Sequence, residues 1–346
     1  MDSYRFVIPF VLLIIGPFFT SSSCVFCEEP FIEILIGATE PVVKNPSPGK
    51  LNNPFAVEFN SSNEMIIVEY EGGRILSWTK DNGLNHLAGS SRVGYRDGPA
   101  ETALFDRLHN LSILDDGTML LSDHLTHSIR RYDPETNIVS TYTGTGKPGP
   151  VVEGAHIQTA TFNVPICVAL TPDKTSLLVA DIGNHRVRRI DLRTGLVSTV
   201  AGNGQKGKPS NGSIATDSPL VDPRGAIQNE AGEVFIIERG GNSLRMIDVE
   251  GKISTLVGNG TAGDRDGDVT RSQLNGPKHL CFGTNGTVFI ADDNNNAIRK
   301  YDPTTKQLTT VNLGKYEIRR PHGVCVHAGW LYIADSFNHR ILRVKL

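Results

Sequence analysis

A short pattern that recurs six times along this 346-residue chain limits the folds open to it more than any other feature. In each copy an apolar run ends in an acidic residue, a polar turn follows, and an aliphatic residue stands six places after the acid. The acids are Glu69, Asp123, Asp181, Glu238, Asp292 and Asp335. The aliphatic residues are Ile75, Ile129, Val187, Leu244, Ile298 and Ile341. Successive copies lie 43 to 58 residues apart, a spacing typical of β-propeller blades.

Each copy contains a succession of short β-rich runs. In the third copy these are "PICVAL", "LLVAD", "RVRRID" and "VSTVAG", the first opened by Pro165 and the second closed by Asp181. Gly, Asn, Asp and Pro separate the runs, which is typical of an antiparallel meander with tight turns. Six such meanders arranged radially predict an all-β fold, a six-bladed β-propeller of four-stranded antiparallel blades.

The two ends of the repeated region complement each other. The sixth copy stops at Leu346 after its third run, so its blade lacks a fourth strand. Near the N-terminus, "IEILIG" at 32–37 matches the fourth-strand pattern of "VSTVAG". We expect this N-terminal strand to complete the last blade, which closes the ring and removes an exposed sheet edge.

The repeated residues carry a family resemblance. The "ADxxNHRIRxxD" core, the "TVAGNG" strand and linkers such as "GYRDGPAETALFDRL" at 94–108 resemble the NHL repeats of extracellular and bacterial proteins. The resemblance extends from Ile32 to Leu346 and implies the propeller fold. It implies little about function, because propellers support both binding and catalysis.

The polar residues that recur in every copy are interpreted as scaffold. A catalytic group is needed once, whereas a residue type repeated in each blade serves something that each blade needs. We expect each repeated acid to accept backbone N–H groups in the turn or to pair with an arginine seven residues on. Four copies have that arginine: Arg130, Arg188, Arg245 and Arg299. The turn position shared by His127, His185, Asn242, Asn296 and His339 is interpreted in the same way.

Function is therefore sought where the copies differ. In a propeller the first strand of each blade lines the central channel, so the residue after the Pro or Leu that opens this strand should face one channel mouth. That position holds Phe55, His109, Ile166, Arg224, Lys278 and His322. The predicted ligand-binding residues are His109, Arg224, Lys278 and His322, and with Arg319 and Arg320 nearby they favour an anionic ligand.

An enzymatic alternative uses the same mouth. The arrangement is similar in outline to the NHL-type propeller of peptidylamidoglycolate lyase, which binds zinc through histidines at "PHS" or "PHD" motifs of its first strands. Here "PHG" at 321–323 matches, "LHN" at 108–110 matches in part, and Arg224 occupies the third place. His279 is one residue out of register and should not face the mouth. Catalytic zinc usually has three protein ligands, so we assign no catalytic residue, metal or cofactor.

The alternative remains a metal-dependent lyase or hydrolase that uses His109, Arg224 and His322, with His109 and His322 as its metal ligands. A calcium-dependent hydrolase similar to gluconolactonases would instead need a cage of oxygen ligands at the channel centre. Asp106 and Asp222 are the acids near enough to supply it, although an aspartate in a loop is commonly a turn former. "DRDGD" at 264–268 is interpreted as a turn for the same reason.

The N-terminus is typical of a secretory signal. Arg5 precedes the apolar run of residues 6–19, and the small residues "TSSSC" follow. We expect a cleaved signal peptide at 1–27 and the propeller at 28–346, hence a secreted protein. The alternative is membrane attachment through an uncleaved segment. Five glycosylation sequons agree with the secretory route: Asn60, Asn110, Asn211, Asn259 and Asn285.

Composition narrows the choice of partners. The formal net charge of −3 and the aromatic content of 7% argue against nucleic acid as a partner. We expect a monomer that binds an extracellular protein, a peptide or an anionic glycan at the mouth and on the long loops between blades. Outside the signal, Cys167, Cys281 and Cys325 are interpreted as buried thiols, with Cys281 and Cys325 the one pair in equivalent places.

Overall fold

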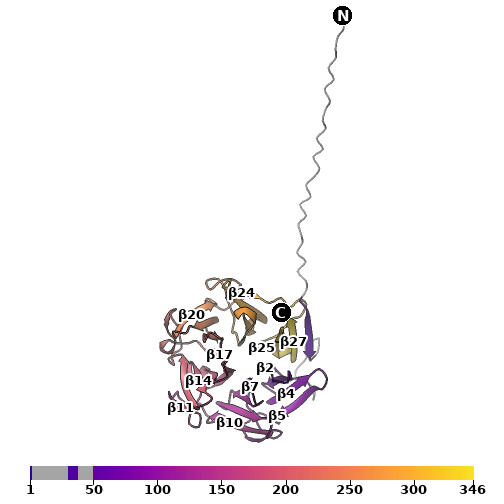
Figure 1. The fold of residues 1–346 in the computed structure, drawn as a ribbon, viewed down its shortest axis with the longest axis vertical. Helices are drawn as coiled ribbons and strands as arrows, with labels where there is room; N and C mark the ends of the chain where they lie inside the picture. The colour runs from indigo at the N-terminus through magenta and orange to yellow at the C-terminus, as the bar shows by residue number, and fades with distance from the viewer. Residues whose placement is uncertain (2–29, 38–49) are drawn as a thin grey trace.

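The structure, a computed structural model, describes residues 1, 30–37 and 50–346, which form six antiparallel sheets set radially around a central channel (Figure 1). The innermost strand of each sheet lies beside that of the next, and the ring is closed. The predicted six-bladed all-β propeller is confirmed. The predicted signal peptide lies outside the described residues apart from Met1. In the described part of the chain, no helix combines the length and the apolar character needed to cross a bilayer.

The first three blades each have four main strands, which follow one another from the channel outwards. Blade 1 contains β2 (Pro54–Phe59), β3 (Met65–Glu69), β4 (Arg74–Thr79) and β5 (Gly83–Ala88). Blade 2 contains β7 (Leu108–Ile113), β8 (Met119–Asp123), β9 (Ser128–Asp133) and β10 (Ile138–Gly144). Blade 3 contains β12 (Pro165–Leu170), β13 (Ser176–Asp181), β14 (Arg186–Asp191) and β15 (Leu196–Ala201), with the short 3₁₀ helix η1 (Ile182–Asn184) after β13.

The other three blades follow the same order. Blade 4 contains β17 (Pro223–Gln228), β18 (Val234–Glu238), β19 (Ser243–Ile247) and β20 (Lys252–Val257), preceded by η2 (Ala215–Asp217). Blade 5 contains β21 (His279–Phe282), η3 (Thr284–Gly286), β22 (Val288–Asp292), η4 (Asp293–Asn295), β23 (Ala297–Asp302) and β24 (Gln307–Thr310). Blade 6 contains β25 (Pro321–His327), β26 (Trp330–Asp335), η5 (Ser336–Asn338), β27 (Arg340–Lys345) and β1 (Ile32–Ile36).

The last blade is completed by the N-terminal strand, as the sequence predicts. β1 pairs antiparallel with β27, with Ile32 opposite Val344 and Ile34 opposite Leu342. Ile32 and Ile34 also pack on the apolar cluster that blades 5 and 6 share. The closure joins strands from the two ends of the repeated region, so the ring cannot open at this blade without breaking a sheet ladder.

The linkers between blades add a feature that the sequence pattern does not predict. In blades 2, 3 and 4 a two-residue strand of the preceding linker pairs with the outermost strand: β6 (Gly98–Pro99), β11 (Ala155–His156) and β16 (Ser213–Ile214). These sheets therefore have five strands rather than four. A linker side chain also accepts the N–H of a threonine on the outermost strand, for example Asp97 from Thr141 at 2.9 Å. The linkers thus protect the sheet edges, besides being exposed loops.

The six repeated acids are scaffold, and each is fully buried. One oxygen of each accepts the backbone N–H of the residue two places before the Pro or Leu that opens its own blade, at 2.6–2.9 Å. The N–H donor belongs to the linker and not to the turn, so the acid fixes the point where the chain turns into the channel. Buried carboxylates held in this way resist removal, because the donors they satisfy would be left unpaired.

The second oxygen of each acid binds a side chain, but not always the predicted arginine. Arg130, Arg245 and Arg299 pair with their acids as expected. Arg188 does not reach Asp181, which accepts a hydrogen bond from Asn184 at 2.8 Å instead. In blades 1 and 6 the arginine lies five residues after the acid, as Arg74 and Arg340. The cation is therefore exchangeable, whereas the backbone contact occurs in all six blades.

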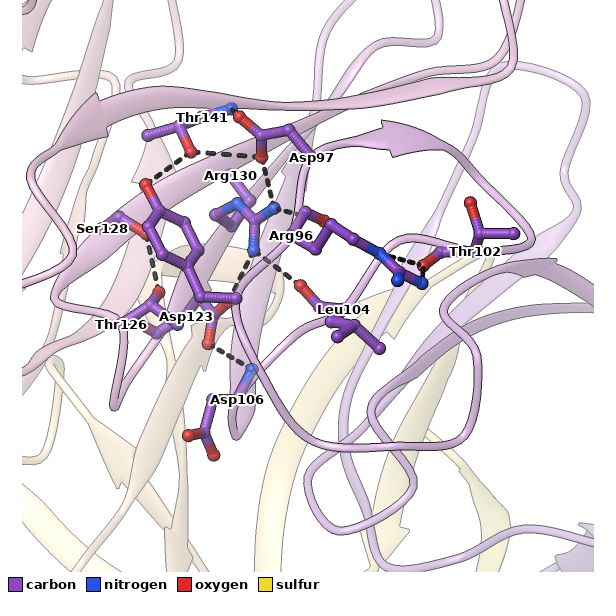
Figure 2. Close-up of polar contacts among 11 residues, drawn as sticks. Arg96, Asp97, Thr102, Leu104, Asp106, Asp123, Thr126, Ser128, Arg130 and Thr141 are labelled. Atoms are coloured by element: carbon purple, nitrogen blue, oxygen red, sulfur yellow. Dashed lines mark hydrogen bonds and ion pairs between the residues drawn. The ribbon is translucent and has the colours of Figure 1, made fainter.

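Figure 2 shows this scaffold in blade 2. The fully buried Arg130 guanidinium donates to Asp123 at 3.0 Å, to the Leu104 carbonyl at 2.9 Å and to Asp97 at 2.5 Å. Asp123 in turn accepts the Asp106 N–H at 2.9 Å. One arginine therefore joins the repeated acid, the linker and the outer edge of the blade. Asp266 of the "DRDGD" stretch binds Arg299 and Thr310 in the same way, which supports the turn interpretation over a calcium loop.

The repeated turn histidines and asparagines connect neighbouring blades. His339 Nδ1 accepts the Asn53 N–H at 3.0 Å, and His127 Nδ1 accepts the Val164 N–H at 3.0 Å. Asn242 and Asn296 make the same contact to the following blade through their amide oxygens, each at 2.8 Å. His185 lies in the same slot, but its Nδ1 is 3.8 Å from Asp222. These residues have left-handed backbone conformations, which asparagine and histidine adopt more readily than most residues.

Candidate functional site

The structure brings the four predicted binding residues together at one mouth of the channel. His109, Arg224, Lys278 and His322 come from four blades, and each is 5–7% exposed. In five blades the strand register shifts at the position after the opening residue, so that the mouth residue is itself a β-bulge. A bulge redirects the side chain that it carries. In each blade the residue directly before the opening Pro or Leu has a positive φ. The bulge thus points the variable position toward the channel axis.

The aromatic and imidazole rings at the mouth pack against one another. Phe55 stacks on His322 with ring centroids 3.7 Å apart, and on its other side it stacks on Tyr70 at 4.2 Å. His109 meets the edge of Phe55 at 4.9 Å, and its Nε2 lies 2.6 Å from Arg224 Nη2. The result is a stack of three rings from blades 1 and 6, with His109 and its partner Arg224 at the edge of the Phe55 ring.

Four further mouth residues were missed by the sequence reasoning. Tyr70, His124, Arg239 and Asp293 each directly follow a repeated acid. Tyr70 Oη lies 3.4 Å from His124 Nδ1, and the charge of Arg239 acts on both Arg224 and Lys278. The same comparison of equivalent positions would have found them, because this position also differs from blade to blade.

Asp293 is the carboxylate that pairs with the mouth cations. It is fully buried, and its Oδ2 lies 2.5 Å from Arg320 and 3.6 Å from Lys278. Its Oδ1 lies 3.7 Å from His322 Nδ1 and has no hydrogen-bond partner in the described part of the chain. Arg319, also predicted near the mouth, is exposed, and its backbone N–H serves the repeated acid Asp335.

Arg224 is a buried cation without an acid. In the described residues no carboxylate lies within ion-pair distance of its guanidinium, and its Nε has no hydrogen-bond partner. Burial lowers the pKa of Arg224 to about 10, so this side chain is charged at neutral pH. Burial, and then the charge of Arg224, lower the pKa of Lys278 to about 7.

The histidines of the mouth do not balance this charge. Burial and the nearby cations hold the pKa values of His109 and His322 well below the usual 6.5 and lower that of His124 to about 4. All three imidazoles are therefore neutral at pH 7. Among the buried mouth groups, Arg224 and part of Lys278 therefore stand against the one carboxylate of Asp293, so positive charge is in excess there.

The mouth residues do not fit the zinc site of the enzymatic alternative. The two histidine rings have centroids 6.3 Å apart, but His109 Nε2 is occupied by Arg224, which also takes the third ligand position. A guanidinium at that place repels a divalent cation. In the described part of the chain, no group of three or more His, Cys, Asp or Glu side chains is placed to hold a metal ion. The calcium site of the other alternative is also disfavoured, because the Asp222 carboxylate pairs with the Lys206 ammonium group at 2.8 Å.

The channel is bridged directly behind the mouth. Asn110 of blade 2 and His279 of blade 5 face each other, with Asn110 Nδ2 3.0 Å from His279 Nε2. As predicted, His279 does not face the mouth. Asn110 is 2% exposed and its Oδ1 accepts the Val168 N–H, so a glycan has no room there in the folded chain. Among the other predicted glycosylation sites, Asn211 and Asn285 are exposed.

Comparisons with known proteins agree with the repeat. No protein-family model matches the chain. It is 25% identical over 284 residues to Protein SUPPRESSOR OF QUENCHING 1, chloroplastic, of Arabidopsis thaliana, covering 75% of this chain and 27% of that protein. It is 24% identical over 339 residues to NHL repeat-containing protein 2 of Gallus gallus, covering 85% of this chain and 46% of that protein. The chain is an NHL-repeat β-propeller.

This NHL-repeat propeller spans less than half of the length of these two curated relatives. Solved structures of similar fold include a virginiamycin B lyase from Staphylococcus aureus with quinupristin, at a TM-score of 0.60 and 14% identity, covering 92% of this chain and 100% of that one. A gluconolactonase from Xanthomonas campestris also has a TM-score of 0.60, at 11% identity, covering 92% of this chain and 89% of that one. At such identities the likeness concerns the fold alone.

Proposed function

We propose that this NHL-repeat propeller is a rigid, non-catalytic binding platform that takes an anionic group of a secreted or extracellular partner into its channel mouth. The observation that supports this most directly is Arg224, which is 7% exposed and has no carboxylate partner in the described residues. A buried charge without a counter-ion is costly, by several kcal/mol after relaxation. A chain that keeps such a cation at the channel mouth has a use for it, and an incoming anion supplies the missing partner.

The chemistry of the mouth narrows the anion. A guanidinium binds carboxylate, sulfate and phosphate groups through two parallel N–H bonds, and Lys278 adds a second, compact charge. The stacked rings of Phe55, Tyr70 and His322 lie beside these cations and make their surroundings largely apolar. An acidic side chain of a protein or peptide, or the acidic group of a sugar, would supply the anion that both cations bind. The class of partner is thus an acidic protein segment, peptide or anionic glycan.

The rest of the propeller is suited to presenting this site. Residues that bind are commonly carried by loops on a rigid frame, and here each mouth residue is followed by a ladder and preceded by a linker held by a buried acid. The exposed linkers and the rim residues Leu125 and Phe337, which are 47% and 43% exposed, extend the contact surface around the mouth. Secretion belongs to the proposal and is supported by the N-terminal apolar run.

Isothermal titration with defined probes tests the proposal. We expect sulfate, citrate and an oligo-glutamate peptide to bind wild-type protein, and Arg224→Gln to weaken that binding at least tenfold. Arg193→Gln is the matched control, because Arg193 is exposed in the turn between β14 and β15. Equal affinity of wild type and Arg224→Gln for every probe would contradict the proposal.

Metal analysis separates the platform from the enzymatic alternative. The platform predicts that purified protein, the His109→Ala variant and the His322→Ala variant contain the same background of zinc and calcium. Stoichiometric zinc in the wild type that disappears in both variants would overturn the platform in favour of a metal-dependent lyase or hydrolase.

A further inference from the structure

Behind the bridge of Asn110 and His279 the channel contains a cavity of about 250 Å³, which we call the rear chamber. Its wall includes one residue from each blade, the fifth counted from the opening residue. These residues are Glu58, Ser112, Ala169, Ile227, Cys281 and Cys325. At about 3.3 Å per residue along a strand, this ring lies about 10 Å from the mouth residues. The rear chamber is thus separate from the proposed anion site.

The chemistry of the rear chamber is opposite to that of the mouth. Glu58 is its one acidic residue, and no cation of the described chain lies close enough to influence this carboxyl, which receives only the backbone contact of Phe59. Most of the remaining wall is apolar, as Val168, Leu280 and Val324 illustrate. The mouth holds a cation without an acid, and the rear chamber holds an acid without a cation.

The other titratable groups near Glu58 stay neutral around pH 7. Burial raises the pKa of Cys167 to about 12 and raises those of Cys281 and Cys325 as well, so these free thiols are protonated. Burial lowers the pKa of His279 to about 4. Burial raises the pKa of Glu58 itself to about 7. Glu58 is therefore the chamber group that changes charge between pH 6 and 8.

We propose that the rear chamber is a second binding site, for a small organic ammonium ion whose charged nitrogen pairs with the Glu58 carboxylate and whose apolar body fills the channel between the innermost strands. Three observations support this: a cavity of suitable volume in the channel, a carboxylate without a cationic partner, and a largely apolar wall. A half-buried carboxylate in largely apolar surroundings is stabilised by a cation that shares its partly desolvated site. The volume restricts the ligand to a small amine, since drug-sized ligands occupy pockets of about 300–1,000 Å³.

Metal ions and neutral molecules fit the rear chamber less well. A soft metal ion would need deprotonated thiols, and both chamber thiols have raised pKa values. A neutral apolar molecule would leave the Glu58 carboxylate unpaired. An ammonium ion needs neither a thiolate nor a protonated acid, and its hydrogens can also reach Ser112 Oγ, which faces the same cavity.

Titration calorimetry with 2-phenylethylamine and its uncharged isostere 2-phenylethanol tests the proposal. At pH 8 we expect the amine to bind at least tenfold more tightly than the alcohol. Glu58→Gln should remove this preference, whereas Glu135→Gln, an exposed acid in the turn between β9 and β10, should leave it unchanged. Because the charged form of Glu58 binds the amine, affinity should rise several-fold from pH 6 to pH 8 in the wild type and stay level in Glu58→Gln.

A second variant keeps the test decisive if Glu58→Gln does not fold. Ala169→Leu narrows the rear chamber while retaining the carboxylate, and it should weaken amine binding without altering anion binding at the mouth. Conversely, Arg224→Gln should leave amine binding intact. Equal affinity for amine and alcohol, or full amine binding by a folded Glu58→Gln variant, would overturn the rear chamber as an ammonium site.

Discussion

Asp292 and Asp293 are neighbours in the chain and both are fully buried, yet their surroundings differ in kind. Asp292 has an equivalent in every blade, and its oxygens accept hydrogen bonds from the Asn275 N–H, from Asn295 and from Arg299 at 2.8 Å each. Asp293 has no equivalent acid in the other blades, and its Oδ1 lacks a hydrogen-bond partner within the described residues. One acid is fully satisfied by its own blade, and the other faces the cations of the mouth.

The comparison extends to the whole propeller. The repeated acids have both carboxylate oxygens satisfied within their own blade, so a change there should cost stability. Positions that differ, such as those of Arg224 and Asp293, contain the unpaired polar atoms of the mouth. Unpaired buried nitrogen atoms also occur in the scaffold, at Arg130 Nε and Arg299 Nε, but those two guanidinium groups have buried acids as partners. Arg224 lacks such a partner, so its position indicates where stability has been given up for binding.

The largest expected effect is the loss of a repeated acid. Asp292→Ala removes the acceptor of three donors and leaves the buried Arg299 with one fewer counter-ion. We expect the free energy of unfolding to fall by about 3–5 kcal/mol, as when one partner of a buried ion pair is deleted. Urea denaturation followed by circular dichroism measures it. A similar loss in Asp293→Asn would contradict the comparison, because that acid is predicted to serve the mouth.

Replacing Arg224 should raise the free energy of unfolding rather than lower it. Arg224→Met replaces a buried cation that lacks an acid by an apolar side chain of similar length, and the neighbouring His109 is neutral at pH 7. We expect the free energy of unfolding to rise by about 1–3 kcal/mol while anion binding is lost. The same denaturation experiment, paired with sulfate titration, checks both. A clear destabilisation would place Arg224 among the scaffold residues.

The Asp293 carboxylate should lower the affinity of the mouth for anions. Asp293→Asn removes the one buried carboxylate that an incoming anion must approach, so sulfate should bind several-fold more tightly to this variant. Titration calorimetry at low ionic strength measures the change. Weaker binding in Asp293→Asn would show that the carboxylate positions the cations rather than opposing the ligand.

The pH dependence of anion binding should follow Lys278. Its pKa is about 7, so this ammonium loses its charge as pH rises from 6 to 9, and sulfate affinity should fall by up to about tenfold over that range. His109, His124 and His322 are neutral throughout the interval and do not contribute. Lys278→Arg should flatten the profile. A profile that stays steep in Lys278→Arg would assign the titration to another group.

Much of the difference between repeated and variable positions could be predicted from the sequence, because both kinds of position are found by comparing the repeats. Six aligned copies gave the blade number, the closure by residues 32–37 and four of the mouth residues. The mouth residues Asp293 and Tyr70 were missed because the copies were compared only at the first strand. The same comparison at the position after the repeated acid would have found them. The pairing of Asp181 with Asn184 in place of Arg188 was not predictable, because blade 5 has the same kind of turn and its acid Asp292 binds both the asparagine and the arginine.

The rear chamber could not be predicted, and the reason is geometric. In "PFAVEF" strict alternation would leave Glu58 as an unremarkable polar residue of a half-buried strand. The bulge after Pro54 changes which residues face the channel, and a bulge has no reliable mark in the sequence. The fifth strands of blades 2–4 escaped for a similar reason, since two residues of a linker carry too little pattern to indicate pairing.

The smallest expected effect concerns the contact between blades 6 and 1. His339 Nδ1 accepts the Asn53 N–H at 3.0 Å, so His339→Ala should lower the free energy of unfolding by about 1 kcal/mol, the net worth of one hydrogen bond. His339→Asn should restore most of it, because Asn242 and Asn296 make this contact in blades 4 and 5 with the same left-handed backbone.

The same contact predicts a dependence on pH. Burial lowers the pKa of His339 below 6.5, so its contribution to stability is fully present above pH 6.5 and is lost as the pH falls through that value toward the folded-state pKa. Protonation also removes the Nδ1 lone pair that accepts the Asn53 N–H. Denaturation at pH 7.5 and 5.5 should therefore show a smaller difference in His339→Asn than in the wild type. An equal difference would mean that the repeated turn histidines do not join the blades. The turn position of His339 would then not contribute to stability as a repeated position should.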